Sequence, residues 1–228
     1  MRLLIATGLA REAKVLAGPG VTVICGGGDS AALEARLVEA AAGADGIVSL
    51  GIGGALADSL KVGDWVVARA VVFEGARYPT DPAWTRRLFA GLGGATAGDL
   101  LGSETMLVAA AAKRAARALS GAIAVDMESH VAARVAQRLG LRFAAARVMS
   151  DDAARDMPAA VSVGMKPDGG MALGPVLLAL AREPAQLGPL IRTGRDAGTA
   201  FAALGRARRL LGPGLGLLDL LERPLDVG

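Results

Sequence analysis

The sequence predicts an α/β fold in which helices cover a central, largely parallel sheet. Between residues 2 and 149, short apolar runs typical of buried strands alternate with helical patterns. Fifty-three per cent of the 228 residues are hydrophobic, which allows a large core. Because only 3% are aromatic and 32 residues are glycine, we expect helices to pack closely on the sheet around small side chains.

Each expected strand is a short apolar run that ends at a turn residue or an acid. The third run leads into a glycine-rich segment, 51–55, which we expect to form a turn. The expected strands are residues 2–6, 21–25, 46–52, 65–73, 96–101, 122–125 and 142–149.

Capping residues mark the start of several expected helices. Asp29 or Ser30 caps one helix, and Asp81 stands before Pro82 at the start of another. The expected helices are residues 9–17, 30–42, 82–90, 106–119 and 127–139. We treat residues 1–228 as one domain that ends in a helical tail from about Leu173.

The composition argues against several classes of protein. The one cysteine, Cys25, cannot form an internal disulfide, and no Cys/His cluster suggests a metal, so we expect neither metal nor cofactor. A net charge of +3 is too small to indicate nucleic-acid binding. The N-terminus lacks a signal-peptide pattern, and the most apolar later stretch, 171–181, is shorter than the roughly 20 residues that cross a bilayer. We therefore expect a cytoplasmic protein.

Acidic residues follow three of the expected strands. Glu12 comes after the first strand, Asp126 and Glu128 after the sixth, and Asp151 after the seventh. Because ligands bind at the carboxyl ends of strands in such sheets, these acids should converge on one edge. Each also has an ordinary explanation, since acids are common in the first turn of a helix and at its N-cap. The glycines at 51–55 lack the spacing of a dinucleotide-binding turn.

Four motifs, in order, resemble those of the methylthioadenosine/S-adenosylhomocysteine nucleosidases. The motifs are GLARE at 8–12, GIGGALADSLKVGD at 51–64, VDME at 125–128 and RVMSD at 147–151. The resemblance covers about residues 2–155 and implies the nucleoside phosphorylase fold. That fold is a three-layer α/β/α arrangement with a mixed, largely parallel twisted sheet.

Within this superfamily the chain resembles most the hopanoid-associated phosphorylase branch. The matching segments are 7–13, 77–84, 126–130 and 190–193. This resemblance implies an enzyme that cleaves the N-glycosidic bond of adenosylhopane in hopanoid biosynthesis, releasing adenine and ribosylhopane. It also implies a small-molecule nucleoside substrate with a lipid-like 5′ group, and the nucleosidase relatives suggest a homodimer.

The resemblance also implies roles for individual residues. Asp151 matches the acid that protonates N7 of the leaving purine, and an aspartate there favours adenine over 6-oxopurines. Glu128 matches the residue that binds the ribose hydroxyls, and Met127 would lie beneath the sugar. Glu12 matches the residue that orients and deprotonates the attacking water. The remaining expected binding residues are Ile52, Gly53, Met106, Leu107 and Ser150.

Water is favoured over phosphate as the nucleophile. Phosphorylases hold phosphate with arginine and with a serine at the position of Ile52, which has no side-chain donor. Arg11 is the one arginine nearby in sequence. The alternatives are phosphorolysis to a ribose 1-phosphate, a methylthioadenosine/S-adenosylhomocysteine nucleosidase, and a catalytically silent binding module, against which the three matching acids argue.

The C-terminal tail combines basic and apolar residues. Six arginines lie between residues 182 and 209, and leucines are frequent from residue 187 to 218. This composition is typical of a segment that rests on anionic lipid, and suggests peripheral contact with the inner membrane. The alternative, slightly favoured, is a helix packed on the domain or on a second subunit.

Overall fold

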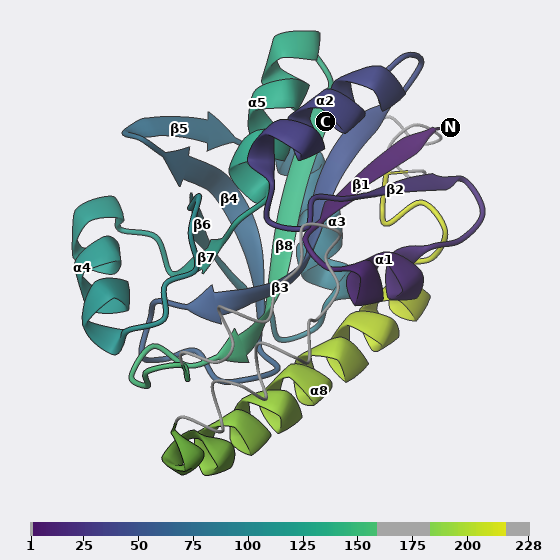
Figure 1. Cartoon of the computed structure of the whole chain (residues 1–228). Coiled ribbons are helices and arrows are strands. Elements are labelled where there is room, and N and C mark those ends of the chain that lie inside the picture. Colours follow the sequence, from purple (N-terminus) through teal and green to yellow (C-terminus); the bar gives the residue numbers. More distant parts are fainter. Residues whose placement is uncertain (1, 159–182, 218–228) are drawn as a thin grey trace.

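The computed structural model describes residues 2–158 and 183–217 and contains one mixed sheet flanked by helices (Figure 1). The strands are β1 (Leu3–Thr7), β2 (Val21–Cys25), β3 (Gly46–Ala55), β4 (Trp65–Phe73), β5 (Ala76–Pro79), β6 (Thr96–Gly102), β7 (Ala124–Asp126) and β8 (Arg142–Asp151). The helices are α1 (Ala10–Leu16), α2 (Ser30–Ala40), α3 (Pro82–Gly91), α4 (Ala110–Ser120), α5 (Ser129–Leu139), the 3₁₀ helix η1 (Pro184–Gln186) and α8 (Leu187–Leu210).

The sheet has the order β2-β1-β3-β7-β6-β4-β5, and β8 pairs with both β3 and β4. Most pairings are parallel, whereas β3–β7, β4–β5 and β4–β8 are antiparallel. Because β8 bridges β3 and β4, the strands β3, β8, β4, β6 and β7 close into a ring. The predicted mixed, largely parallel α/β fold is confirmed, and the closed ring is an addition to it.

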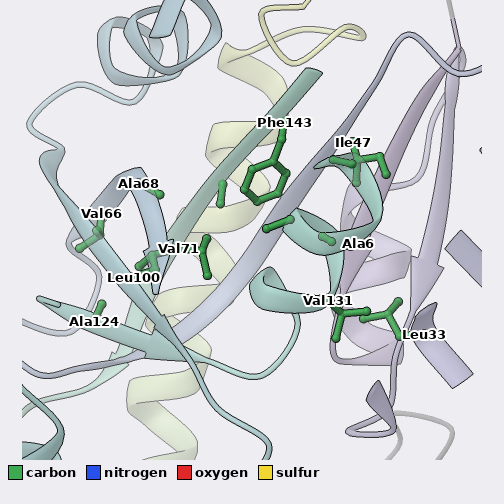
Figure 2. Packing of buried hydrophobic residues seen from close by; sticks show 14 of the residues in the cluster. Ala6, Leu33, Ile47, Val66, Ala68, Val71, Leu100, Ala124, Val131 and Phe143 are labelled. Carbon is green, nitrogen blue, oxygen red and sulfur yellow. The ribbon is translucent and has the colours of Figure 1, made fainter. Parts of the chain in front are cut away.

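Helices cover both faces of the sheet, so the fold has three layers. On one face, α2 and α5 pack over a core that includes Leu33, Ile47, Val131 and Phe143 (Figure 2). On the other face, α1, α3 and α8 pack over a second core around Trp84 and other buried side chains. The long helix α8 packs beside α1 on this face, as Figure 1 shows.

Small side chains allow the helices to approach the sheet closely, as the composition predicts. The middle of β8 is a run of three fully buried alanines, 144–146, whose alternate members face the two cores. On α5, Ala132, Ala133 and Ala136 are buried against the same sheet. Trp84 is the large exception. Its ring is fully buried, and its Nε1 donates to the carbonyl oxygen of Leu215 at 2.8 Å, which holds the end of the described chain against α3.

Two sequence-based boundaries near the site are wrong. The glycine-rich segment after residue 52 is not a turn. It is the end of β3, whose Gly54 and Ala55 pair with β7 after a register shift at Gly53/Gly54. The helix expected at 106 begins only at Ala110, because its first free N–H group is capped by the side chain of Asp156, 46 residues away.

Two further differences lie away from the site. The short strand β5 was not expected. It forms a hairpin with β4 through Glu74 and Gly75, which both have positive φ angles as this tight turn requires. The helical tail is present as α8, but its expected start at about residue 173 lies outside the described residues. No described helix is both long enough and apolar enough to cross a membrane.

Candidate active site

A cavity lies where the ends of β1, β3, β7 and β8 meet. Its volume is about 210 Å³, more than ten times the roughly 15 Å³ that one water needs, so it can admit an organic ligand. Three side chains of α8, Thr193, Ala197 and Phe201, form part of its wall. The wall also contains every residue that the sequence analysis expected to catalyse the reaction or bind the substrate: Glu12, Ile52, Gly53, Met106, Leu107, Met127, Glu128, Ser150 and Asp151.

Glu12, in the first turn of α1, is held by donors from two parts of the chain. Its Oε2 accepts from the Thr7 hydroxyl and from the backbone N–H groups of Gly8 at 2.9 Å and Leu9 at 2.8 Å. Among the described residues, its Oε1 accepts from the N–H of Ile52 alone, at 2.7 Å. With one donor against the three of Oε2, Oε1 is the oxygen with room for a further donor from the cavity.

Glu128 follows β7 and belongs to a buried cluster of charges. Arg147 on β8 donates to Asp126 and lies 3.5 Å from Oε2 of Glu128. Burial, and then the neighbouring charge of Asp126, raise the pKa of Glu128 to about 8 despite this arginine. Asp126 is buried as well, but the Arg147 guanidinium and Ser129 hold the pKa of that carboxyl below its ordinary value. Asp126 is therefore the paired, ionised member, and Glu128 the acid that is poised near neutral pH.

Asp151 ends β8 on the other side of the cavity. Its Oδ2 is ion-paired with Lys113 of α4, and its Oδ1 accepts from the Ser150 hydroxyl at 3.2 Å. Burial raises the pKa of Asp151, while Lys113 and Ser150 act in the opposite direction. A raised pKa suits a carboxyl group that must carry a proton before it can donate one.

Glycine residues make room for each of the three acids. A Cβ on Gly51 would stand 2.6 Å from Oε1 of Glu12, and a Cβ on Gly54 would stand 3.3 Å from both oxygens of Asp151. A Cβ on Gly8 would stand 2.8 Å from Cδ of Glu128. Because these glycines have no Cβ, the three carboxyl groups can pack directly against the backbone.

Several residues of the site escaped the sequence analysis. Lys113 lies among alanines and arginines in a helix whose other basic residues are exposed, so nothing local distinguishes it. Arg147 was noted only as part of a motif, although its guanidinium is buried and also donates to Ser49 at 2.7 Å. The α8 wall is formed by residues that lie 42 to 50 positions beyond the end of β8, and no local pattern links them to the site.

Arg11, the arginine considered for an anion, does not line the cavity. Its guanidinium lies 4.1 Å from the ring centroid of Phe201, in a cation–π contact with this residue of the α8 wall. Among residues 2–158 and 183–217, no group of three His, Cys, Asp or Glu side chains could hold a metal ion.

Solved structures with the same fold include a futalosine hydrolase and 5′-methylthioadenosine/S-adenosylhomocysteine nucleosidases. The native futalosine hydrolase of Helicobacter pylori is 15% identical with a TM-score of 0.62, and the match covers 92% of this chain and 97% of that one. The 5′-methylthioadenosine/S-adenosylhomocysteine nucleosidase of the same organism is 14% identical (TM-score 0.61; 91% and 97% covered). The corresponding nucleosidase of Colwellia psychrerythraea in complex with adenine is 18% identical (TM-score 0.60; 88% and 96% covered).

No curated protein sequence matches the chain. The family model of the phosphorylase superfamily matches residues 3–168, which is most of the chain and includes every strand described above. The fold and this match agree, and the chain belongs to the phosphorylase superfamily, whose members are enzymes that act on nucleosides.

Proposed function

We propose that the protein hydrolyses the N-glycosidic bond of a 5′-substituted adenosine and releases adenine. The observation that supports this most is the arrangement of Glu12, Glu128 and Asp151 around one cavity. Cleavage of this bond needs an acid for the purine, an anion near the cationic sugar and a base for the nucleophile. The three carboxyl groups supply these functions from three sides of the cavity.

In this proposal each acid acts on a different part of the nucleoside. Asp151, with its raised pKa, donates a proton to N7 of adenine as the glycosidic bond breaks. Glu128, once ionised, accepts hydrogen bonds from the ribose 2′- and 3′-hydroxyls and stabilises the positive charge of the sugar. Glu12 takes a proton from the attacking water through Oε1, the oxygen with an open acceptor position.

The charges around the cavity favour water over phosphate as the nucleophile. Within the described part of the chain, no lysine or arginine lines the cavity, whereas four carboxyl groups do. Arg147 is committed to Asp126, and Arg11 stacks on Phe201. A phosphate dianion would therefore find no unpaired cation among these residues to compensate its charge. Phosphorolysis to a ribose 1-phosphate is the second candidate.

The wall of the cavity is mainly apolar, which fits a hydrophobic group at the 5′ position. Leu9, Met106, Leu107, Met157 and Phe201 all contribute to it. Together with the hopanoid-associated motifs, this makes adenosylhopane our proposed substrate and ribosylhopane the second product. The narrower alternative is methylthioadenosine or S-adenosylhomocysteine, the substrates named for two of the similar structures.

We further propose that the enzyme is a cytoplasmic homodimer that contacts the inner membrane through the start of α8. Leu187 and Ile191 are about half exposed there, one turn apart, next to Arg192. Leu215 and Leu217, the last leucines of the described residues, are unsuited to this role because they are fully buried against the core. Sedimentation with anionic lipid vesicles tests the contact, and Leu187→Asn with Ile191→Asn should abolish it.

The substrate assay separates these candidates. The purified protein is incubated with adenosylhopane, methylthioadenosine or adenosine, each with and without phosphate, and free adenine is measured. We expect release without phosphate and fastest turnover of adenosylhopane. Release that depends on phosphate would favour the phosphorylase, and equal or faster turnover of methylthioadenosine would favour the narrower nucleosidase.

The variant Asp151→Asn tests the role of the acid. An amide cannot donate a proton to N7 in the same way, so we expect adenine release to fall by about 100-fold or more. Because the side chain keeps its size, far-ultraviolet circular dichroism should not change. Turnover at the normal rate would mean that another group protonates the purine.

A further inference from the structure

Lys113 is a buried lysine whose ammonium group binds the end of β8 and the residues that follow it. Its side chain is fully buried, and its Nζ is ion-paired with Oδ2 of Asp151. Nζ also donates to the carbonyl oxygens of Asp152, at 2.8 Å, and Arg155, at 3.4 Å. An ammonium group has three hydrogens, and here each has an acceptor within one stretch of five residues. Lys113 does not line the cavity, so it can reach a substrate only through Asp151.

We propose that Lys113 is a positioning residue for purine protonation, which holds Asp151 and stabilises the carboxylate that forms when Asp151 gives up its proton. This inference rests on the proposed function. In the step, the proton leaves a carboxyl oxygen of Asp151 for N7, and the electron pair of the glycosidic bond passes to the purine. Adenine leaves neutral, and Asp151 is left as an anion.

The anion that remains is the reason for a buried cation at this place. Asp151 is largely removed from water, where an unpaired carboxylate is costly, so burial alone would make it a poor proton donor. Lys113 offsets that cost in the product state, when the full negative charge has developed. Its ion pair also occupies Oδ2, so Oδ1, which accepts one hydrogen bond from Ser150, is the oxygen left to act on the purine.

The other charges near Asp151 do not take over this task. Asp152 adjoins it and opposes its ionisation, and the charge of Asp152 is itself paired with Arg155. Asp156 caps α4 through the N–H of Ala110. Glu12 and Glu128 line the same cavity and carry the same sign as Asp151. Lys113 is thus the one cation in contact with Asp151 among the described residues.

The test compares Lys113→Met, Lys113→Arg and the control Arg114→Met, which alters an exposed neighbour on α4. Each variant is assayed on an adenine nucleoside, whose leaving group needs a proton, and on 4-nitrophenyl riboside, whose leaving group does not. Thermal unfolding of each variant checks that the fold is intact. The pH dependence of kcat is measured for the adenine nucleoside.

For Lys113→Met we expect kcat on the adenine nucleoside to fall on the order of 100-fold with KM nearly unchanged, and turnover of the nitrophenyl riboside to change little. The high-pH limb of the kcat profile should move upward, because Asp151 loses the cation that favours its ionised form. Lys113→Arg should recover part of the rate, and Arg114→Met should behave as wild type.

Equal losses on both substrates, or an unmoved pH profile, would overturn the positioning role. If Lys113→Met did not fold, the same comparison would rest on Lys113→Arg, which keeps the charge but changes its geometry. In that case an unchanged ratio of the two substrates would overturn the inference. Failure of the wild-type protein to release adenine from any nucleoside would instead refute the proposed function itself.

Discussion

The contact between Gly8 and Glu128 allows a direct test of whether the position of the Glu128 carboxyl group determines the rate. In Gly8→Ala, the new Cβ would stand 2.8 Å from Cδ of Glu128 and closer still to Oε1. Carbon atoms normally approach to about 3.5–4.0 Å, so the carboxyl group must move by roughly 1 Å. The backbone of residue 8 itself tolerates alanine, because its φ angle is not among the positive ones.

A displacement of that size should remove most of the benefit of Glu128. A misplacement of about 1 Å in a catalytic group can cost on the order of 100-fold in rate, and we expect kcat/KM for ribosides to fall by that amount. A 2′-deoxyriboside cannot offer Glu128 the full pair of hydroxyls, so its smaller kcat/KM should fall less. The assay is adenine release from matched ribosides and 2′-deoxyribosides.

Two further variants show whether the loss passes through Glu128. In a Glu128→Ala background the clash is absent, so Gly8→Ala should cost almost nothing more, which is a coupling that a double-mutant cycle measures. Gly198→Ala is the matched control, because its Cβ would meet nothing within 4 Å and it lies inside α8. Riboside turnover by Gly8→Ala within twofold of wild type would refute the reasoning, as would full additivity with Glu128→Ala.

Other predictions follow from the buried charges. Because the pKa of Glu128 is about 8, its ionised form should appear as pH rises through that value, and KM for ribosides should fall over the same range but not in Glu128→Gln. The raised pKa also means that Glu128 stabilises the folded state below pH 4.5, its ordinary pKa, and that this contribution is lost as pH rises to about 8. Urea titrations at both pH values can detect the loss of stability. Arg147→Met leaves Asp126 buried without its partner, so we expect a loss of about 3–5 kcal/mol in stability, measured by denaturant unfolding; a loss below 1 kcal/mol would contradict the importance of this pair.

Strand and helix order could be inferred from the sequence because local patterns carry that information. The run 65–73 and the cap at Asp81 followed by Pro82 both appear in the structure where the sequence placed them. Glu12 and Asp151 reach one edge because β1, β3 and β8 are parallel and share their carboxyl ends. Glu128 reaches the same edge from β7, which is antiparallel to the end of β3. These are consequences of hydrophobic period and chain direction, which are visible in a single sequence.

What the sequence did not reveal depends on contacts between distant residues. The start of α4 depends on Asp156, and the continuation of β3 depends on pairing with β7. Lysine is usually exposed to solvent, and Lys113 is buried only because α4 meets the end of β8. Such features need the tertiary arrangement, because the partner that decides each one lies tens of residues away.

In the proposed function, water is favoured as the nucleophile because the cations near the site are already paired. Arg147 and Lys113 are each held by an acid, so the space left for the substrate is bordered by carboxyl groups. In the proposed function, ionised Glu128 stabilises the ribosyl cation, and a phosphate dianion would find no unpaired cation beside it, which favours water as the nucleophile. Restoring the serine of the phosphorylases at Ile52 would not change this, because the N–H of residue 52 is already bound to Glu12 and no cation would be freed. Ile52→Ser should therefore leave adenine release independent of phosphate.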